Sequence, residues 1–309
     1  MHKDSRALEG LPAERVMADL GEPQSLVRAF DGVEVVYHLA ASISLERRQR
    51  DFMMRTNVEG TANVLSACRA AGVRRLVHFS SIEALSDQGG AAPTVETNPL
   101  AERDDTTAYG WSKACAETLV LEAAAEGLEA VILNPTAIIG PYDFRPSALG
   151  RALISLAQGR LPLLVHGGFN WVDVRDVVEA ALAAEQLGTP GERYLVSGTW
   201  MSLPDLASLV DEATDTRTGR GAAPLWAASV GAALLGALGS LNGRQPVFTL
   251  DTLRALSKHR HISSEKARTQ LGYGPRALQQ TVPETIAWFR EQGYLPDSDA
   301  SAVGAVGEG

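Results

Sequence analysis

A tyrosine and a lysine stand four residues apart, at Tyr109 and Lys113, in a stretch that predicts a helix. Residues i and i+4 of a helix lie on the same face, so the two side chains are neighbours. A lysine ammonium beside a phenol favours the phenolate and lowers a pKa that is about 10 in isolation. Such a phenol can exchange a proton with a carbonyl or alcohol oxygen while a hydride moves. The same spacing also occurs on plain surface helices, so the surrounding elements must decide between the two interpretations.

The segments around this pair alternate between strand and helix patterns. Strands are predicted at residues 14–18, 33–39, 74–79 and 130–133, and helices at residues 23–30, at 57–71 and from Tyr109 onward. Such alternation predicts a parallel, doubly wound α/β sheet, which binds ligands at the carboxyl ends of its strands. Several polar or small residues follow directly after predicted strands, namely residues 38–41, 80–81 and 134–136. We therefore expect them to meet at one edge of the sheet, beside the Tyr109 helix.

The composition is that of a globular protein with an acidic balance. Its 309 residues include 28 lysines and arginines and 37 aspartates and glutamates, which gives a net charge of −9. That balance, without a basic block, argues against a nucleic-acid partner. Cys68 and Cys115 lack the spacing of a metal site, and we expect no metal centre. Two isolated cysteines and an N-terminus without an apolar run predict a reduced, cytoplasmic protein without a signal peptide.

Taken together, these motifs resemble the extended short-chain dehydrogenase/reductase family, also called the NAD-dependent epimerase/dehydratase family. The resemblance extends from about residue 5 to residue 294 and depends on the order and spacing of the motifs. The segments that carry it are residues 38–41, 56–61, 79–81, 109–113, 134–141, 171–177, 266–267 and 271–273. Residues 134–140, Gly150 and residues 191–194 are most similar to the aldehyde-reductase and flavonoid-reductase-like branch.

The resemblance implies a catalytic set of three residues. Tyr109 would be the general acid/base, and Lys113 would bind the nicotinamide ribose and hold down the tyrosine pKa. Ser81 would hydrogen-bond the substrate oxygen, a role for which Ser80 is the competitor. The residues that would line or support the cofactor are Asp19, Leu20, His38, Leu39, Ala40, Asn57, Ser80, Tyr109, Lys113, Pro135, Thr136 and Ile138.

One departure from the family pattern concerns the start of the fold. The family begins with a strand, a glycine-rich turn and a helix, and the turn binds the cofactor pyrophosphate at a helix N-terminus. Nothing before Asp19 resembles Gly-x-x-Gly-x-x-Gly. We therefore expect an N-terminally truncated βαβ unit, with about 30 residues missing, and an open edge on the strand at residues 33–39. The alternative is a genuine short form that dimerises or acts without a cofactor.

The expected domain organisation is a dinucleotide-binding domain and a smaller, mostly helical substrate-binding cap. We assign residues 1–140 and 163–198 to the first, residues 141–162 and 199–295 to the cap, and residues 296–309 to a disordered tail. The apolar run at residues 225–241 is short for a membrane span, so we favour a cap helix over membrane-surface contact. Of the two carboxylates Asp173 and Asp176, we expect one to cap the following helix.

The predicted function is hydride transfer between nicotinamide and a carbonyl or alcohol substrate. We favour NADP over NAD, chiefly from the reductase-like branch and also because Lys3 and Arg6 are basic. A nucleotide-sugar epimerase or dehydratase is the alternative enzyme, kept open by Arg145 and Arg151. An inactive fragment or a non-catalytic binding protein is the alternative outside enzymes. The expected partners are a small carbonyl or nucleotide-sugar substrate and a second copy in a homodimer.

Overall fold

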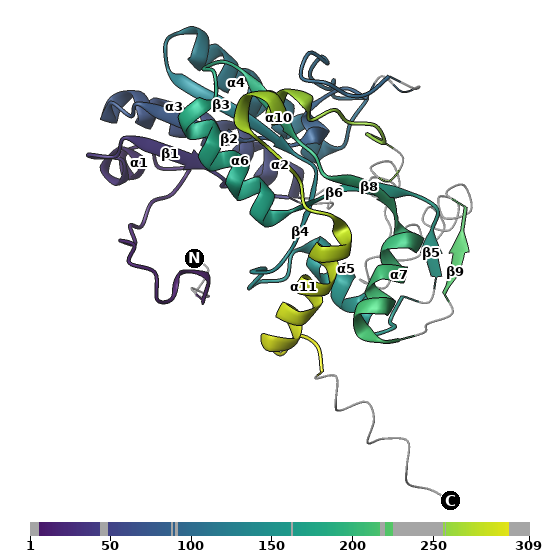
Figure 1. Ribbon diagram of the computed structural model, residues 1–309. Coiled ribbons are helices and arrows are strands. Elements are labelled where there is room, and N and C mark those ends of the chain that lie inside the picture. Colours follow the sequence, from purple (N-terminus) through teal and green to yellow (C-terminus); the bar gives the residue numbers. More distant parts are fainter. Residues whose placement is uncertain are drawn as a thin grey trace, which may run out of the picture.

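A four-stranded parallel sheet forms the centre of the computed structural model (Figure 1). The structure describes residues 6–43, 49–87, 89, 92–161, 163–216, 220–224, 256 and 258–296. The sheet has the order β1-β2-β3-β7, and its strands are β1 (Val35–His38), β2 (Arg75–Phe79), β3 (Glu129–Pro135) and β7 (Arg193–Val196). The predicted parallel α/β sheet is thus confirmed. The outer edge of β1 pairs with no described strand.

Helices cover both faces of this sheet because alternate strand residues point to opposite sides. Leu76 of β2 packs in one apolar cluster with three helices, whereas Val77 packs in another with two helices. The helices on the Leu76 face are α1 (Pro23–Ala29), α3 (Gly60–Ala71) and α4 (Ala108–Ala125). Those on the Val77 face are α6 (Val174–Leu187) and α10 (Glu265–Leu271).

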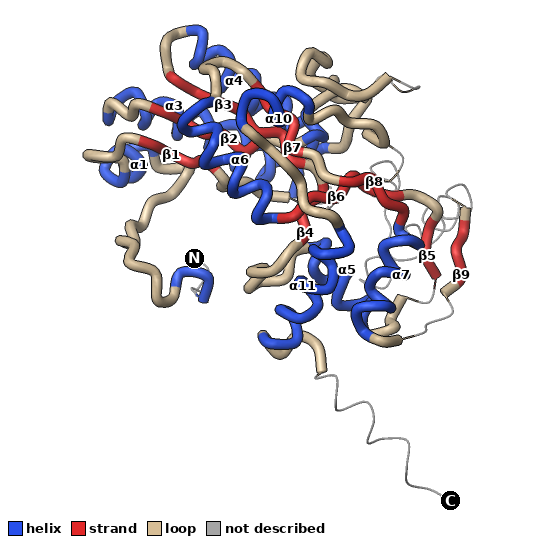
Figure 2. The backbone as a smooth tube through the Cα atoms, viewed as in Figure 1, coloured by secondary structure: helices blue, strands red, loops and turns tan. Residues whose placement is uncertain are grey.

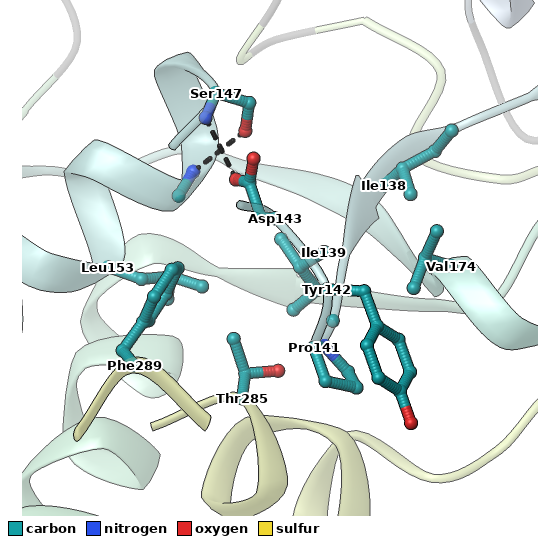
Figure 3. Close-up of a pocket in the computed structure, with 12 residues that line it drawn as sticks. Ile138, Ile139, Pro141, Tyr142, Asp143, Ser147, Leu153, Val174, Thr285 and Phe289 are labelled. Atoms are coloured by element: carbon teal, nitrogen blue, oxygen red, sulfur yellow. Dashed lines mark hydrogen bonds between the residues drawn. The ribbon is translucent and has the colours of Figure 1, made fainter. Parts of the chain in front are cut away.

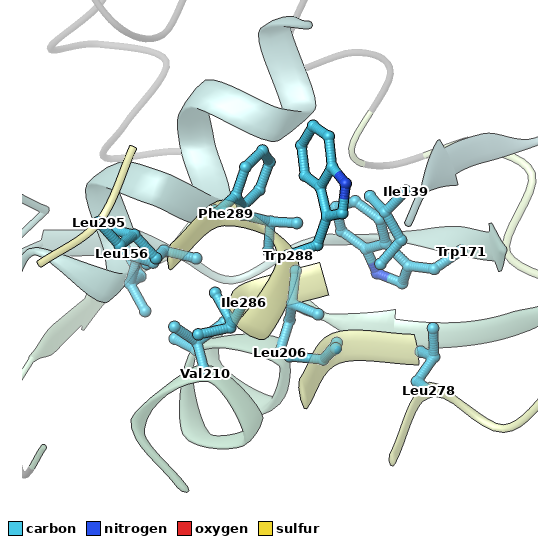
Figure 4. Packing of buried hydrophobic residues seen from close by; sticks show 14 residues of the cluster. Ile139, Leu156, Trp171, Leu206, Val210, Leu278, Ile286, Trp288, Phe289 and Leu295 are labelled. Carbon is cyan, nitrogen blue, oxygen red and sulfur yellow. The ribbon is translucent and has the colours of Figure 1, made fainter. Parts of the chain in front are cut away.

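A third apolar cluster forms the core of the cap (Figure 4). Trp288, Phe289 and Ile286 pack there against side chains of neighbouring helices. The helices are α5 (Ala148–Ala157), α7 (Leu203–Thr214) and α11 (Leu278–Glu291). Two small sheets flank them, one of β4 (Ala137–Ile139), β6 (Gly168–Asp173) and β8 (Thr199–Ser202), the other of β5 (Leu163–Val165) and β9 (Gly221–Ala223).

Side-chain caps fix where the helices near the sheet edge begin. The Thr107 hydroxyl accepts a hydrogen bond from the Gly110 N–H at 3.0 Å, and α4 begins directly after it. Asp173 caps α6 by accepting from the Arg175 N–H at 2.8 Å, so the predicted cap is confirmed. Each cap satisfies a backbone N–H that has no partner inside the helix.

The structure corrects the prediction for residues 14–18. They form no strand, and Figure 2 draws them as loop. A strand needs a neighbour for its backbone hydrogen bonds, and no described strand lies beside this segment. Val16 and Met17 are exposed as a result.

Strand pairing bears on the expected domain boundaries. Within residues 163–198, which the sequence assigns to the sheet domain, β7 pairs in the main sheet and α6 packs on it, whereas β5 pairs with β9 and β6 pairs with β4 and β8. Conversely, α10 packs against the main sheet and not in the cap cluster. A short helix, α2 (Arg50–Met54), and a π-helical turn, η3 (Arg55–Glu59), precede α3, where one helix from residue 57 was predicted.

Two further predictions lie outside the described residues: the apolar run at 225–241 and the tail beyond residue 296. Among the helices that the structure describes, none has the length and apolar character that a membrane crossing requires.

Candidate active site

Tyr109 lies in the first turn of α4, against the short 3-10 helix η4 (Ile82–Ala84) that follows β2. The close approach depends on Gly110, because a Cβ built there would lie 2.5 Å from the Glu83 carbonyl oxygen. The approach places the Ser81 hydroxyl, which accepts from the Glu83 N–H at 3.2 Å, near the Tyr109 side chain. Two polar groups that are 28 positions apart in the sequence therefore meet at the carboxyl end of β2.

The pKa of Tyr109 is shifted in the direction opposite to the predicted one. Burial raises the pKa of Tyr109 to about 12. The nearby Ser81 hydroxyl opposes this rise, and the Glu83 carboxylate adds to it. Lys113 was expected to hold this pKa down, but loss of solvation outweighs the favourable contacts. The phenol is therefore protonated at neutral pH in the protein without cofactor and can act as a proton donor.

Lys113 lies one helical turn after Tyr109 and is 5% exposed. Its ammonium donates to the Phe79 carbonyl oxygen at 2.7 Å, at the end of β2. Burial lowers the pKa of Lys113 to about 8, and the nearby Glu117 carboxylate opposes that shift. An ammonium carries three protons, and Phe79 provides the one hydrogen-bond acceptor found among the described residues. The remaining donors fit the hydroxyl groups of a bound ribose.

Asn57 connects the loop after β1 to the start of α4. It is 2% exposed and lies in the π-helical turn, a feature that often marks functional sites. Its amide donates to the Ser112 hydroxyl at 2.9 Å and accepts from the Ser42 N–H at 2.7 Å. Ser112 in turn donates to the Tyr109 carbonyl oxygen at 2.7 Å. Asn57 thus fixes the backbone that carries the tyrosine.

Glu117 was not identified in the sequence, although its position four residues after Lys113 on the same helix could have indicated it. Its side chain is fully buried and accepts hydrogen bonds from Ser80 at 2.5 Å and Asn134 at 2.8 Å. Its other oxygen lies 2.8 Å from Nε of Arg193 at the start of β7. The Ser80 hydroxyl therefore donates its proton to Glu117 and not to the cofactor or substrate.

The other residues predicted to line the cofactor follow the strand ends. Leu39 and Ala40 are exposed directly after β1. Pro135 ends β3, Thr136 follows it, and the half-buried Ile138 lies in β4. This edge of the sheet is the expected place for a nicotinamide ring.

Three other residues that were predicted to line the cofactor, His38, Asp19 and Leu20, contact neighbouring parts of the protein. His38 is buried, its Nε2 lies 3.0 Å from the Thr61 hydroxyl, and burial lowers its pKa to about 4. Asp19 is exposed and accepts from the Gly21 N–H at 2.8 Å. Leu20 packs against α3, where a Cβ on Gly60 would lie 3.2 Å from it. The described residues therefore fit the nicotinamide end of a dinucleotide and contain no glycine-rich turn for its pyrophosphate.

Arg6, whose positive charge favoured NADP in the sequence analysis, lies against the cap region. Its guanidinium donates to the Phe144 carbonyl oxygen at 2.8 Å and to the Tyr294 hydroxyl at 3.0 Å, both in the cap region. The structure thus gives no support for a contact between Arg6 and a cofactor 2′-phosphate.

A cavity of about 250 Å³ lies beyond β4, between the loop that follows it, α5 and α11 (Figure 3). Its walls include Val174, Leu153 and Phe289, and Asp143 lies at one end, where it accepts from the Ser147 N–H at 2.8 Å. Of the predicted site residues, Ile138 alone lines it. The cavity therefore borders the candidate site without containing its proton donor.

The chain is similar to known proteins over most of its length. Residues 2–197 match the model of the NAD dependent epimerase/dehydratase family. The chain is 36% identical over 296 residues to sterol demethylase protein B of Methylococcus capsulatus, covering 94% of this chain and 89% of that protein. It is 30% identical over 301 residues to 4-hydroxy-2-methyl-3-oxo-4-farnesyl-3,4-dihydroquinoline-1-oxide ketoreductase of Stigmatella aurantiaca, covering 94% and 88%. The crystal structure of gox2253 superposes with a TM-score of 0.83 at 33% identity, covering 94% and 89%.

Proposed function

Because the chain belongs to the NAD-dependent epimerase/dehydratase family, a family of NAD(P)-dependent oxidoreductases, we propose that it reduces a ketone or oxidises the corresponding secondary alcohol. The observation that carries this proposal is the position of the Ser81 hydroxyl near Tyr109, beside the buried ammonium of Lys113 that donates to the Phe79 carbonyl oxygen at 2.7 Å. Together they provide a proton donor, a hydrogen-bond partner for the substrate oxygen and a cation at one strand end.

In the proposed mechanism the chain binds, orients and protonates the substrate. Ser81 and Tyr109 hold the carbonyl oxygen, and Tyr109 donates its proton to that oxygen as negative charge develops there. Lys113 binds the ribose hydroxyls, and Leu39, Ala40 and Ile138 line the ring. The bound nicotinamide supplies or accepts the hydride. In the oxidation direction the same phenol, once deprotonated, removes the proton of the alcohol.

We further propose an apolar substrate and NADP as the preferred cofactor. The similarity to sterol demethylase protein B and to a ketoreductase of a farnesylated quinoline supports a ketone or alcohol on an apolar body. The similarity to a ketoreductase is the ground on which we prefer NADPH to NADH as the hydride donor.

The first test is cofactor binding, followed by turnover. A ligand that binds only the folded protein raises its melting temperature, so a rise with NADPH that exceeds the rise with NADH supports both the fold of the site and the cofactor preference. Apolar ketones are then screened with NADPH or NADH, and sterols with NADP⁺ or NAD⁺, by the change in nicotinamide absorbance. UDP-glucose is screened by chromatography of the sugar nucleotide, because epimerisation or dehydration returns the hydride to the sugar and leaves the absorbance unchanged. Tyr109→Phe is expected to lower kcat by about 10²- to 10⁴-fold.

The matched control is Tyr142→Phe, which removes a hydroxyl from a tyrosine that is 62% exposed and lies outside the proposed machinery. Equal loss in both variants would contradict the role of Tyr109. Turnover of UDP-glucose without any ketone or alcohol would favour the epimerase alternative. Binding without any turnover would favour a non-catalytic protein.

A further inference from the structure

Trp200 lies on the face of the cap sheet that looks toward the candidate site. It pairs with Asn170 across the antiparallel strands β6 and β8, and directly opposed residues point to the same side. The Asn170 side chain accepts from the Thr136 hydroxyl at 3.5 Å, directly after β3. The neighbours of Asn170 on the opposite side, Phe169 and Trp171, pack in the cap core. The Trp200 ring thus lies on the face that continues from the proposed nicotinamide position.

Arg260 is held over this ring. Its guanidinium carbon is 4.3 Å from the Trp200 ring centroid, within the range of a cation–π contact. Its backbone neighbour His261 accepts from the Thr94 N–H at 2.8 Å, and Lys258 donates to the Asp105 carbonyl oxygen. Thr94 and Asp105 belong to the loop that joins Ser81 to Tyr109. The segment around Arg260 therefore crosses from the cap sheet to that loop.

The charge of Arg260 is not balanced by a carboxylate among the described residues. The side chain is exposed, and no described acidic group lies within ion-pair distance of it. Lys258 lies two residues before it, so two cationic side chains stand close together in a protein of net charge −9. Burial lowers the pKa of His259 to about 4, so its imidazole adds no charge at neutral pH. Among the acids near this segment, Asp87 accepts from the His259 N–H at 2.9 Å. A local basic segment of this kind attracts anions.

We propose that Arg260, positioned by Trp200, binds a carboxylate on the substrate. The planar guanidinium matches a carboxylate in a two-point contact, and the indole beside it offers apolar surface to the adjoining carbon chain. The substrate class is then a hydroxy acid or oxo acid with an apolar body. This inference rests on the proposed oxidoreductase function and adds to it the group that sets substrate preference.

The test compares an acid with its ester. Oxidation of 3-hydroxydecanoate and of methyl 3-hydroxydecanoate by the full chain with NADP⁺ is followed by absorbance, with NAD⁺ in parallel. Arg260→Gln is expected to lower the acid-over-ester ratio of kcat/KM by about 10- to 100-fold, mainly through KM, because a charge-assisted hydrogen bond is lost. Arg268→Gln, at an exposed arginine of α10, is the matched control and is expected to leave the ratio unchanged.

Each outcome separates the two proposals. Ester turnover with an acid-over-ester ratio that Arg260→Gln does not change overturns the carboxylate role and leaves the oxidoreductase function standing. Turnover of neither compound counts against the oxidoreductase function, and melting with decanoate then tests Arg260 alone. A rise in melting temperature that Arg260→Gln abolishes supports the site, and no rise overturns it. Inhibition by UDP-glucose that depends on Arg260, with an unchanged ratio, would assign the arginine to phosphate instead.

Discussion

Replacing Gly110 by alanine tests whether the distance between α4 and η4 sets the activity. The new Cβ would lie 2.5 Å from the Glu83 carbonyl oxygen, and an ordinary contact begins at 3.4 Å. The Thr106 hydroxyl would also be displaced, but a side chain can rotate, whereas the Glu83 backbone is held within η4. The first turn of α4 must therefore move away from η4 by about 0.9 Å, and Tyr109 moves with it.

We expect Gly110→Ala to affect kcat more than it affects the free energy of unfolding. A displacement of about 1 Å between catalytic groups can cost about 100-fold in rate, so we expect kcat to fall by about that factor. Overpacking costs about 1–3 kcal/mol, and the better helix propensity of alanine returns about 1 kcal/mol. The free energy of unfolding should therefore change by no more than about 2 kcal/mol.

The assay measures kcat and KM with NADPH and the best ketone from the screen, together with urea unfolding. Gly274→Ala is the matched control because Gly274 has open space around its Cβ position and no positive φ. A Gly110→Ala enzyme with a kcat within about threefold of wild type and unchanged stability would refute the argument. A variant that unfolds in the absence of urea would show that the contact serves folding and not the alignment of Tyr109.

Two further predictions concern the buried charges of α4. Glu117→Ala removes the acceptor of Arg193 and of two buried polar groups, so the free energy of unfolding measured in urea should fall by about 3–5 kcal/mol. The control Glu122→Ala, at an exposed residue, should change it by no more than about 0.5 kcal/mol. Equal losses in the two variants would contradict the role of the buried cluster. Lys113, whose pKa burial lowers to about 8, loses its proton as the pH rises through that value. The affinity for NADPH should therefore fall between about pH 7 and pH 9, and a dissociation constant that does not change with pH would count against the ribose contact.

Local patterns explain why much of this fold could be predicted. The strands β1, β2, β3 and β7 are short apolar runs with turn signals, and their alternation with helices limits the sheet to a parallel one. The residues 14–18 show the limit of this approach, because they have strand-like composition but no neighbouring strand in the described fold. Whether a segment forms a strand depends on a neighbouring strand as well as on its own residues. Composition alone therefore predicted a strand here that does not form.

The sequence by itself determined that Tyr109 and Lys113 share a helix face, because helical periodicity needs only local spacing. The tertiary structure alone decided that Ser81 meets Tyr109 while Ser80 turns to Glu117, because both depend on how closely α4 approaches the end of β2. It also decided the direction of the Tyr109 pKa. Solvation depends on everything that packs around a side chain, and most of those neighbours are distant in the sequence.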